Sequence, residues 1–371
     1  MELGNKGEAR MRDATIKMTA LSVLTAVLML GVAGCNNSEQ ATAVAEPAGA
    51  AEAQFAEMLA LTVSGNNRAV TKLPLIIAWD KGLFQKHGLD VNLLLPGPDT
   101  PAGREIPPKP GMEKVPGEIV YRGGTPMLLG AARNPGQPHQ IDIGSTDCAV
   151  RANIIGPKGS ETTITKLEDL RGKRLGISSE ITAQAFQARL LAERMGWDYT
   201  KDFTSVVVAD EGFEELTQGL VDVIFASEYT YSAAKSAGYP VLFDLAEWNE
   251  EVGGNSIAVN PEWLQDPTNR EKARRFLMAT AEAIAIFHNQ PDEARRILRE
   301  WNGHEDPRLI DDVIERGAWL PRKPYACVAG LEKTVALFPD IVKGQFTAAD
   351  FYDNSIIEEI DASGYLDGLY R

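Results

Sequence analysis

Short runs of β-type residues alternate with amphipathic helical runs along most of this chain, and this alternation restricts its fold more than any other feature. Residues 58–64 predict a strand, residues 73–86 a helix that ends before Gly88, and residues 89–95 the next strand. Strands that alternate with helices indicate an α/β fold. Beyond Pro261 the pattern is mostly helical, which predicts a C-terminal layer of helices.

Length, composition and charge narrow the class of protein. The chain has 371 residues, enough for two lobes and a C-terminal layer, since domains run to about 100–200 residues. Its 44% hydrophobic and 24% charged residues are ordinary for a soluble globular protein. The formal net charge of −15, with no compensating Lys/Arg cluster, repels phosphate backbones and excludes nucleic acid as a partner.

The N-terminal segment has the features of an export signal. The chain begins with four basic side chains, Lys6, Arg10, Arg12 and Lys17. The uncharged residues 18–34 that follow are short for a membrane span, which needs about 20 apolar residues. They end in Val32-Ala33-Gly34-Cys35, which is similar to the lipobox of bacterial lipoproteins. The similarity implies that residues 1–34 are a signal peptide and that Cys35 is lipidated; the alternative is an ordinary signal peptide with a chance cysteine.

Residues 35–56 are rich in alanine, glutamate and small polar residues, which predicts a flexible tether because such residues cannot offset the entropy of ordering. A tether behind a lipid anchor holds a soluble domain near a membrane. Two further cysteines, Cys148 and Cys327, can pair in an exported protein or remain buried free thiols. The sequence leaves both alternatives open.

Two further patterns bear on the organisation of the chain after residue 56. Residues 96–116 include Pro107-Pro108 and Pro110-Gly111 and predict a surface insertion without regular structure. A weak internal repeat also occurs: helix-like residues 125–133 lead into a short strand at 140–144, and residues 213–218 lead into another at 219–224. Each strand carries an Asp between aliphatic residues. We therefore expect two similar α/β units, one in each lobe.

Several segments resemble the NMT1/SsuA-like periplasmic solute-binding proteins of ABC transporters. They are Trp79-Asp-Lys-Gly-Leu-Phe84 with Lys86-His-Gly-Leu-Asp-Val91, Leu167-Glu-Asp-Leu-Arg-Gly-Lys-Arg-Leu-Gly-Ile177, Gly219-Leu-Val-Asp222, and Phe351-Tyr352 with Gly364-Tyr-Leu-Asp367. The resemblance extends from about residue 58 to the C-terminus. It implies an α/β, two-lobed periplasmic-binding-protein (type II) fold with mixed sheets flanked by helices and with C-terminal helices.

This resemblance divides the chain into parts. The first lobe spans residues 57–158, with the insertion at 96–116, and the second lobe spans residues 159–250. Residues 251–371 return to the first lobe and form the C-terminal helices. The first crossover between the lobes is expected near residues 150–159. Fewer residues separate Asp142 from Thr165 in this chain than is usual in the family.

Ligands of such folds bind beyond the carboxyl ends of the strands, where loops lead into helix N-termini. Four such loops supply candidate ligand-binding residues: Asn66, Asn67 and Arg68; Ser145, Thr146 and Asp147; Ser178, Ser179 and Thr182; and Glu228 with Tyr229. Simple turns and helix caps also explain the Asn and Ser residues. Arg122, which precedes a helix, has the planar fork that binds a carboxylate or sulfonate, although a loop arginine is more often solvated.

Sequence motifs for catalysis are absent. The four histidines show no zinc-type spacing, and the chain carries no C-x-x-C, G-x-S-x-G, phosphate-loop or dinucleotide motif. We therefore expect no catalytic residue, metal or cofactor.

The resemblance implies a monomeric lipoprotein in the periplasm or at the cell surface, held to the membrane by Cys35. It implies that the protein captures a small organic solute, anionic or heteroaromatic/aromatic, and delivers it to an ABC permease. Two alternatives remain. One is an enzyme on the same scaffold, resembling chorismate dehydratase or a pyrimidine-precursor synthase. The other is a lipoprotein receptor that feeds a sensor without transport.

Overall fold

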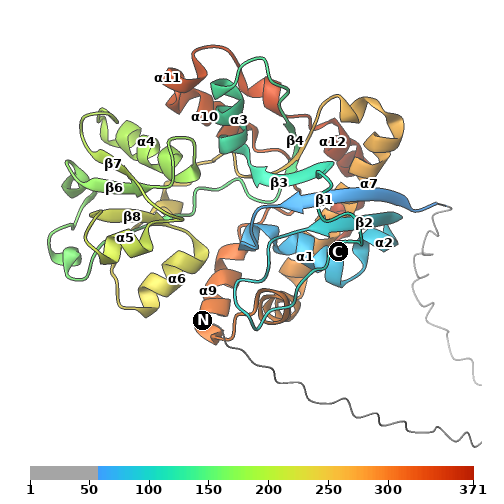
Figure 1. Cartoon of the computed structure of the whole chain (residues 1–371), viewed down its shortest axis with the longest axis horizontal. Coiled ribbons are helices and arrows are strands. Elements are labelled where there is room, and N and C mark those ends of the chain that lie inside the picture. Colours follow the sequence, from blue (N-terminus) through green and yellow to red (C-terminus); the bar gives the residue numbers. More distant parts are fainter. Residues whose placement is uncertain (1–56) are drawn as a thin grey trace, which may run out of the picture. The chain divides into compact units, whose positions relative to one another are not determined.

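The computed structural model describes residues 57–371, in which ten strands form two five-stranded sheets (Figure 1). The signal peptide, the tether and the lipidation of Cys35 predicted above lie outside these residues. The first sheet has the order β2-β1-β3-β10-β4. Its strands are β1 (Leu59–Gly65), β2 (Leu89–Leu94), β3 (Ile119–Gly123), β4 (Ile141–Ser145) and β10 (Asn255–Val259).

The second sheet repeats the topology of the first. Its order is β7-β6-β8-β5-β9. The strands are β5 (Asn153–Ile155), β6 (Arg174–Ile177), β7 (Thr204–Val207), β8 (Val223–Ala226) and β9 (Val241–Asp244). In each sheet one strand, β10 or β5, runs antiparallel to both of its neighbours. The predicted α/β fold with two mixed sheets is therefore confirmed.

The chain crosses between the lobes earlier than the sequence suggested. Because β5 pairs with β8 and β9, the first crossing is complete before Asn153 rather than at residues 150–159. The predicted repeat is also misaligned. The strand orders match β4 with β9 and β3 with β8, so the two segments proposed as repeats, which lead into β4 and β8, are not equivalent.

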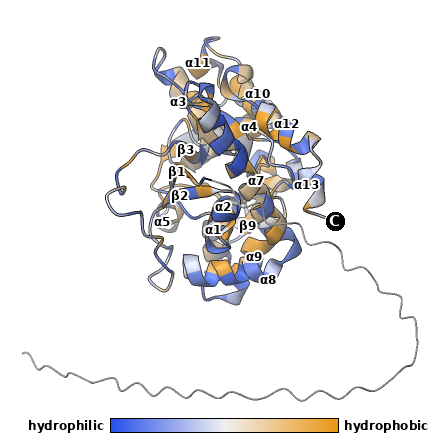
Figure 2. Ribbon diagram, turned by 90° about the vertical axis from the view of Figure 1, so that its right-hand side faces the viewer, coloured by the Kyte–Doolittle hydropathy of each residue, from blue (hydrophilic) through white to orange (hydrophobic). Residues whose placement is uncertain are grey.

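Helices cover the faces of both sheets. Against the first sheet and its core pack α1 (Leu73–Asp80), α2 (Leu83–Lys86), α7 (Pro267–Asn289), α8 (Pro291–Ile297), α9 (Pro307–Gly317), α12 (Ser355–Ala362) and α13 (Tyr365–Gly368). The predicted helix at 73–86 is interrupted by Gly82, whose φ of 66° favours glycine. In Figure 2 hydrophobic and hydrophilic residues alternate along the same surface helices, as expected for amphipathic helices.

One hydrophobic core extends from one lobe into the other. It includes α3 (Gly124–Arg133), α10 (Val328–Leu337) and α11 (Pro339–Val342) beside the first sheet, and α4 (Ala183–Met195) beside the second. The other face of the second sheet packs on α5 (Phe213–Thr217) and α6 (Glu228–Ser236). The lobes are thus joined by apolar packing as well as by the chain. No helix within residues 57–371 combines the length and the apolar character needed to cross a bilayer.

The two crossing segments are hydrogen-bonded to each other. Val150 N donates to Glu250 O (3.0 Å), and Val252 N donates to Cys148 O (2.9 Å). Cys148 also forms a disulfide with Cys327, with a Cα–Cα distance of 5.3 Å. This resolves the alternatives left open by the sequence and fastens the first crossing segment to the start of α10.

A buried carboxylate joins β4 to β10. Asp142 is fully buried and accepts hydrogen bonds from Gly144 N (2.9 Å), Ser145 Oγ (2.6 Å) and Ser256 Oγ (2.8 Å). Burial raises its pKa from 3.8 to about 6, although these hydrogen bonds oppose the rise.

Removing the disulfide should destabilise the fold. It closes a loop across a sequence separation of 179 residues, so it restricts the unfolded chain strongly. We expect Cys148→Ser/Cys327→Ser to lower the free energy of unfolding by about 2–5 kcal/mol, measured by urea unfolding followed by circular dichroism. Dithiothreitol should bring the wild type to the same midpoint. An unchanged midpoint in both experiments would show that the bond contributes nothing.

The buried carboxyl of Asp142 should make stability depend on pH. The folded state binds this proton more tightly than the unfolded chain does. Its stabilising contribution is therefore complete below about pH 4 and is lost as pH rises through about 6. Relative to Asp142→Asn, the wild type should lose roughly 3 kcal/mol of unfolding free energy between pH 4 and 7. Asp292→Asn, at a side chain that is 98% exposed, is the control. Parallel pH profiles for the wild type and Asp142→Asn would contradict the argument.

Candidate ligand-binding site between the two sheets

A cavity of about 160 Å³ lies where loops from both sheets meet. The loop after β1 and the start of α6 after β8 form opposite walls, so the cavity lies at the carboxyl ends of strands from both lobes. Its lining residues are Asn67, Arg68, Ala69, Asp99, Glu211, Ser227, Glu228, Tyr229 and Thr230. Ligands of open α/β sheets bind at this end of the strands.

Arg68 forms part of the first wall and is anchored by main-chain carbonyls. The side chain is 1% exposed. Its Nε donates to Pro96 O (2.8 Å), and its Nη1 donates to Arg104 O (3.0 Å) and Trp301 O (2.5 Å). Burial lowers its pKa, against the opposing effect of Glu105 and Asp99. The buried Nη2 has no hydrogen-bond partner within the described residues. The guanidinium therefore holds the insertion in place and retains an unused donor.

Lys72 places a second cation near the same wall. It ends the short helix η1 (Val70–Lys72) and is 4% exposed. Burial lowers its pKa to about 8, while Glu228 and Asp147 favour its charged form. The helix is fixed by Thr146, whose Oγ1 donates to Thr71 O (2.6 Å). Lys72 is therefore a buried, mostly charged ammonium that is attracted by carboxylates of two different elements, although it does not itself line the cavity.

The first crossing segment contributes an ion pair. Arg151 Nη2 lies 2.5 Å from Asp147 Oδ1, with both side chains largely buried. Arg151 Nη1 also donates to Arg316 O, and the Arg316 guanidinium lies 4.0 Å from the ring centroid of Tyr231 on α6. The charge of Asp147 is thus neutralised locally, and the crossing segment is tied to α9.

Glu228 presents a carboxylate from the second lobe. Within residues 57–371 it forms no hydrogen bond or ion pair within 4.0 Å. Burial raises its pKa to about 7, and the charges of Arg151 and Lys72 oppose this rise. The neighbouring carboxylate of Glu211 differs because it accepts from Ser227 N (3.0 Å) and from the Ser227 hydroxyl. Burial also raises the pKa of Glu211. Glu211 therefore caps the start of α6, whereas Glu228 is unpaired.

Tyr229 closes the cavity by contacting the first lobe. Its hydroxyl donates to Arg68 O (3.2 Å), and its ring centroid lies 4.5 Å from that of His304. Burial raises the pKa of this phenol well above its ordinary value. Asn302 Nδ2 donates to Arg68 O and to Asp99 Oδ2, both at 2.8 Å, and His304 Nε2 lies 3.0 Å from the same Asp99 oxygen. Asp99 is consequently a paired carboxylate.

The structure brings together some of the residues predicted from the sequence. Asn67, Arg68, Glu228 and Tyr229 line the cavity, and Asp147 interacts electrostatically with Lys72 and Glu228. Asn66 lies in the same loop but is exposed.

The other predicted residues are engaged elsewhere. Ser145 and Thr146 are fully buried and bonded to Asp142 and Thr71. Ser178 Oγ donates to Gln184, and Thr182 Oγ1 donates to Ser179 O, so these hydroxyls order the loop before α4. Arg122 lies on β3, donates to Gln140 (2.9 Å) and lines a separate pocket beside α3.

Sequence reasoning missed Lys72 and Arg151. Lys72 is the only charged residue from Val70 to Ala78, a run that is apolar apart from Thr71, and a single lysine inside such a run is a signal for a buried charge. Arg151 follows Asp147 by four residues, but the pairing depends on the path of the crossing segment. Neither residue belongs to a known motif.

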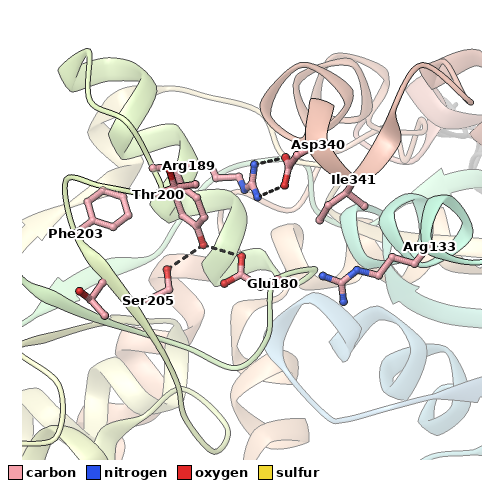
Figure 3. Close-up of a pocket in the computed structure, with 10 residues that line it drawn as sticks. Arg133, Glu180, Arg189, Thr200, Phe203, Ser205, Asp340 and Ile341 are labelled. Carbon is pink, nitrogen blue, oxygen red and sulfur yellow. Dashed lines mark hydrogen bonds and ion pairs between the residues drawn. The ribbon is translucent and has the colours of Figure 1, made fainter.

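A larger hollow of about 440 Å³ lies between α4 and α11. Figure 3 shows Arg189 pointing at Asp340 across it, with two hydrogen bonds of 2.6 and 2.9 Å. The guanidinium also lies 4.4 Å from the ring centroid of Tyr199 and 4.3 Å from that of Phe338. Because the charge of Arg189 is paired, we interpret this hollow as part of the contact between lobes and the smaller cavity as the ligand site.

The described residues offer no group of His, Cys, Asp and Glu side chains able to hold a metal ion. None of the described histidines hydrogen-bonds a serine, threonine or cysteine. Their partners are the side chains of Glu282, Tyr365 and Asp99 and the main-chain carbonyls of Asp350 and Leu320. None of the described histidines therefore acts as a base on a hydroxyl or thiol, and the hydroxyl–carboxylate pair in the cavity is that of Ser227 with Glu211.

Truncation of Arg68 should loosen the insertion. Arg68→Ala leaves three carbonyls without this donor and removes a buried side chain, and we expect a loss of about 2–4 kcal/mol in unfolding free energy. Trypsin should then cut faster after Arg104, Lys109 or Lys114, detected by mass spectrometry. Arg122→Ala, which loses a single bond to Gln140, is the matched control. Equal stability and equal cleavage in the two variants would exclude the anchoring role.

Comparison with known proteins agrees with this fold. Residues 153–294 match the family model described as NMT1/THI5 like. No curated protein matches the chain. A putative periplasmic sulfonate-binding protein SsuA of an ABC transporter, from Methylobacillus flagellatus KT, shares 14% identity with a TM-score of 0.60, covering 84% of this chain and 96% of that chain.

Two further solved structures are similar. The periplasmic nitrate-binding protein NrtA from Synechocystis PCC 6803 shares 12% identity with a TM-score of 0.61, covering 85% of this chain and 91% of that one. The desulfurization enzyme DSZB shares 14% identity with a TM-score of 0.55, covering 82% and 99%. At these identities the likeness establishes the fold. The resemblance expected from the sequence is thus confirmed: the chain matches the NMT1/THI5-like family over residues 153–294 and has the fold of periplasmic binding proteins.

Proposed function

We propose that this protein is the solute-binding component of an ABC importer, which captures a small organic solute between its lobes and delivers it to a membrane permease. One observation carries the proposal: unpaired charges from both lobes converge on a cavity at the carboxyl ends of the strands. The sulfonate- and nitrate-binding proteins of similar fold support it.

The geometry suits capture by closure of the lobes. Arg68 and Lys72 belong to the first lobe, and Glu228 and Tyr229 belong to the second. A solute that contacts both sets binds the closed form more tightly than an open one, and this difference is what drives closure. The shared core around α3, α4 and α10 is the pivot of such a motion.

The chemical class we propose for the solute is a small acid, including an aromatic or heteroaromatic one. Two of the three unpaired charges, on Arg68 and Lys72, are positive. The other nearby carboxylates are engaged: Asp147 by Arg151, Asp99 by His304 and Asn302, and Glu211 by Ser227. An acidic group therefore meets the positive charge of Arg68 on the cavity wall and that of Lys72 in the short helix that follows this wall.

An enzymatic role is not favoured, although DSZB has a similar fold. No described histidine bonds a hydroxyl in the candidate site, and Glu211, which accepts from the Ser227 hydroxyl, also accepts from Ser227 N and so serves as a cap of α6. Turnover of a compound in the ligand screen would indicate an enzyme.

The proposal includes export and anchoring. The disulfide between Cys148 and Cys327 suits an oxidising compartment such as the periplasm or the cell surface. Lipidation of Cys35, outside the described residues, would hold the protein at the membrane near its permease.

Solute binding is tested by a thermal-shift screen followed by native mass spectrometry for co-purified ligand. Small carboxylates and sulfonates should raise the melting temperature by about 4 °C at 100 times their dissociation constant. Lys72→Met should abolish most of this shift, and Lys114→Met, at an exposed lysine, should not. Stabilisation by amines or polyamines alone would refute the acidic ligand, and turnover of a metabolite would refute the transport role.

A further inference from the structure

The two lobes are joined differently on their two sides. Beside α3, α4 and α10, one apolar core continues from the first lobe into the second. On the other side, where α6 of the second lobe lies against α9 of the first (Figure 1), the apolar residues form a separate cluster in each lobe. Among the described residues, only Tyr229 of the second lobe packs on the cluster of the first. This side can therefore open with little loss of apolar packing.

Polar side chains bridge the boundary between α6 and α9 instead, and the carboxylate of Asp312 on α9 is at their centre. Its Oδ2 accepts from the hydroxyl of Ser232 (3.2 Å), and its Oδ1 lies 3.3 Å from Lys235 Nζ, both on α6. Ser232 is 1% exposed, and a buried hydroxyl needs a hydrogen-bond partner. Lys235 is about half exposed, so its ion pair contributes little by itself. The hydrogen bond from Ser232 is therefore the stronger of the two contacts.

Arg316, which follows Asp312 by one turn of α9, adds two further contacts. Its Nη1 donates to Arg151 O (2.8 Å) on the first crossing segment, and its guanidinium lies 4.0 Å from the ring centroid of Tyr231 on α6. A hollow of about 280 Å³, lined by residues of both helices, lies beside these contacts. Because this space is not filled by side chains, the helices are held by a few discrete contacts that water can replace when they separate.

Helix α6 connects these contacts to the candidate solute cavity. Its first residues, Glu228 and Tyr229, line the cavity. Ser232 and Lys235 follow Tyr229 at intervals of three residues, which places them on the same side of the helix. Contact of Ser232 and Lys235 with α9 therefore holds the cavity wall of the second lobe against the first lobe. Asp312 itself does not line the cavity.

We propose that Asp312 and Arg316 form a polar latch, which binds α6 in the closed form and so sets how easily the solute cavity opens. The latch stabilises closure without contacting the solute. It offsets part of the cost of burying Lys72 and Glu228, and the solute supplies the remainder. This inference rests on the proposed function, for which it identifies a regulating contact outside the cavity.

The separation of the lobes can be measured without any solute. Nitroxide labels on Thr217→Cys in α5 and Arg308→Cys in α9, two exposed positions, report the distance across this side of the molecule by pulsed electron paramagnetic resonance. In the purified protein, Asp312→Ala should raise the ratio of the open to the closed form about tenfold, equivalent to about 1.4 kcal/mol. The reason is that a buried hydroxyl and a lysine lose their common partner.

Matched variants show whether the effect arises from contact with α6. Asp311→Ala removes the neighbouring carboxylate, whose ion pair with Arg295 lies within the first lobe, and should leave the ratio unchanged. Ser232→Ala/Lys235→Met should reproduce the effect of Asp312→Ala from the other helix, with α9 intact. Combining the three substitutions should add little, because they remove the same contacts.

The outcomes separate the latch from the proposed function. Equal distance distributions in the wild type, Asp312→Ala and Asp311→Ala would overturn the latch. A single long distance in the wild type would overturn it too, because the contact between α6 and α9 then does not form. Neither result bears on solute binding, which fails only if the thermal-shift screen finds no solute. A tenfold shift confined to the variants that lack the Asp312 contacts supports the latch.

Discussion

The pairing of the two crossing segments is the constraint on which the rest of this structure depends. Each sheet takes its antiparallel strand, β5 or β10, from the chain that has just left the other sheet, so the two crossings must run side by side. They satisfy each other's main-chain groups, as in the bond from Asn255 N to Asp147 O (2.9 Å). Their position fixes Asp147 and Arg151 at the junction of the lobes, where Asp147 interacts electrostatically with Lys72 and Arg151 with Glu228.

The local sequence predicted those strands whose apolar residues are also the buried ones. Strands β1 and β2 were predicted at 58–64 and 89–95, within one residue of their observed bounds, because their apolar residues are buried in the core. The short strands β3, β5, β7 and β9, each of three to five residues, were missed because hydrogen bonds to distant strands define them. The misaligned repeat has the same cause: an Asp between aliphatic residues marks both β4 and the approach to β8, and only strand order reveals that they are not equivalent.

The sequence located the site by its loops but could not assign the side chains within them. Loops after parallel strands converge for topological reasons, which is why Arg68 and Glu228 share a cavity. Whether a hydroxyl is available to a ligand depends on partners far along the chain: Ser145 shares Asp142 with Ser256, and Thr146 is bound to Asn255. The unused donor of Arg68 and the isolation of Lys72 likewise arise from packing and leave no local signal.

Charges without a hydrogen-bonded partner explain why the proposed closure should require a solute. With the lobes apart, water can solvate Lys72 and Glu228. With the lobes together, burial disfavours both charges, as the lowered pKa of Lys72 and the raised pKa of Glu228 show. The empty closed form is therefore penalised, whereas a solute that pairs these groups removes the penalty from the closed form alone. A ligand shifts a conformational equilibrium only by such a difference in affinity, so the same charges that select the solute also make closure depend on it.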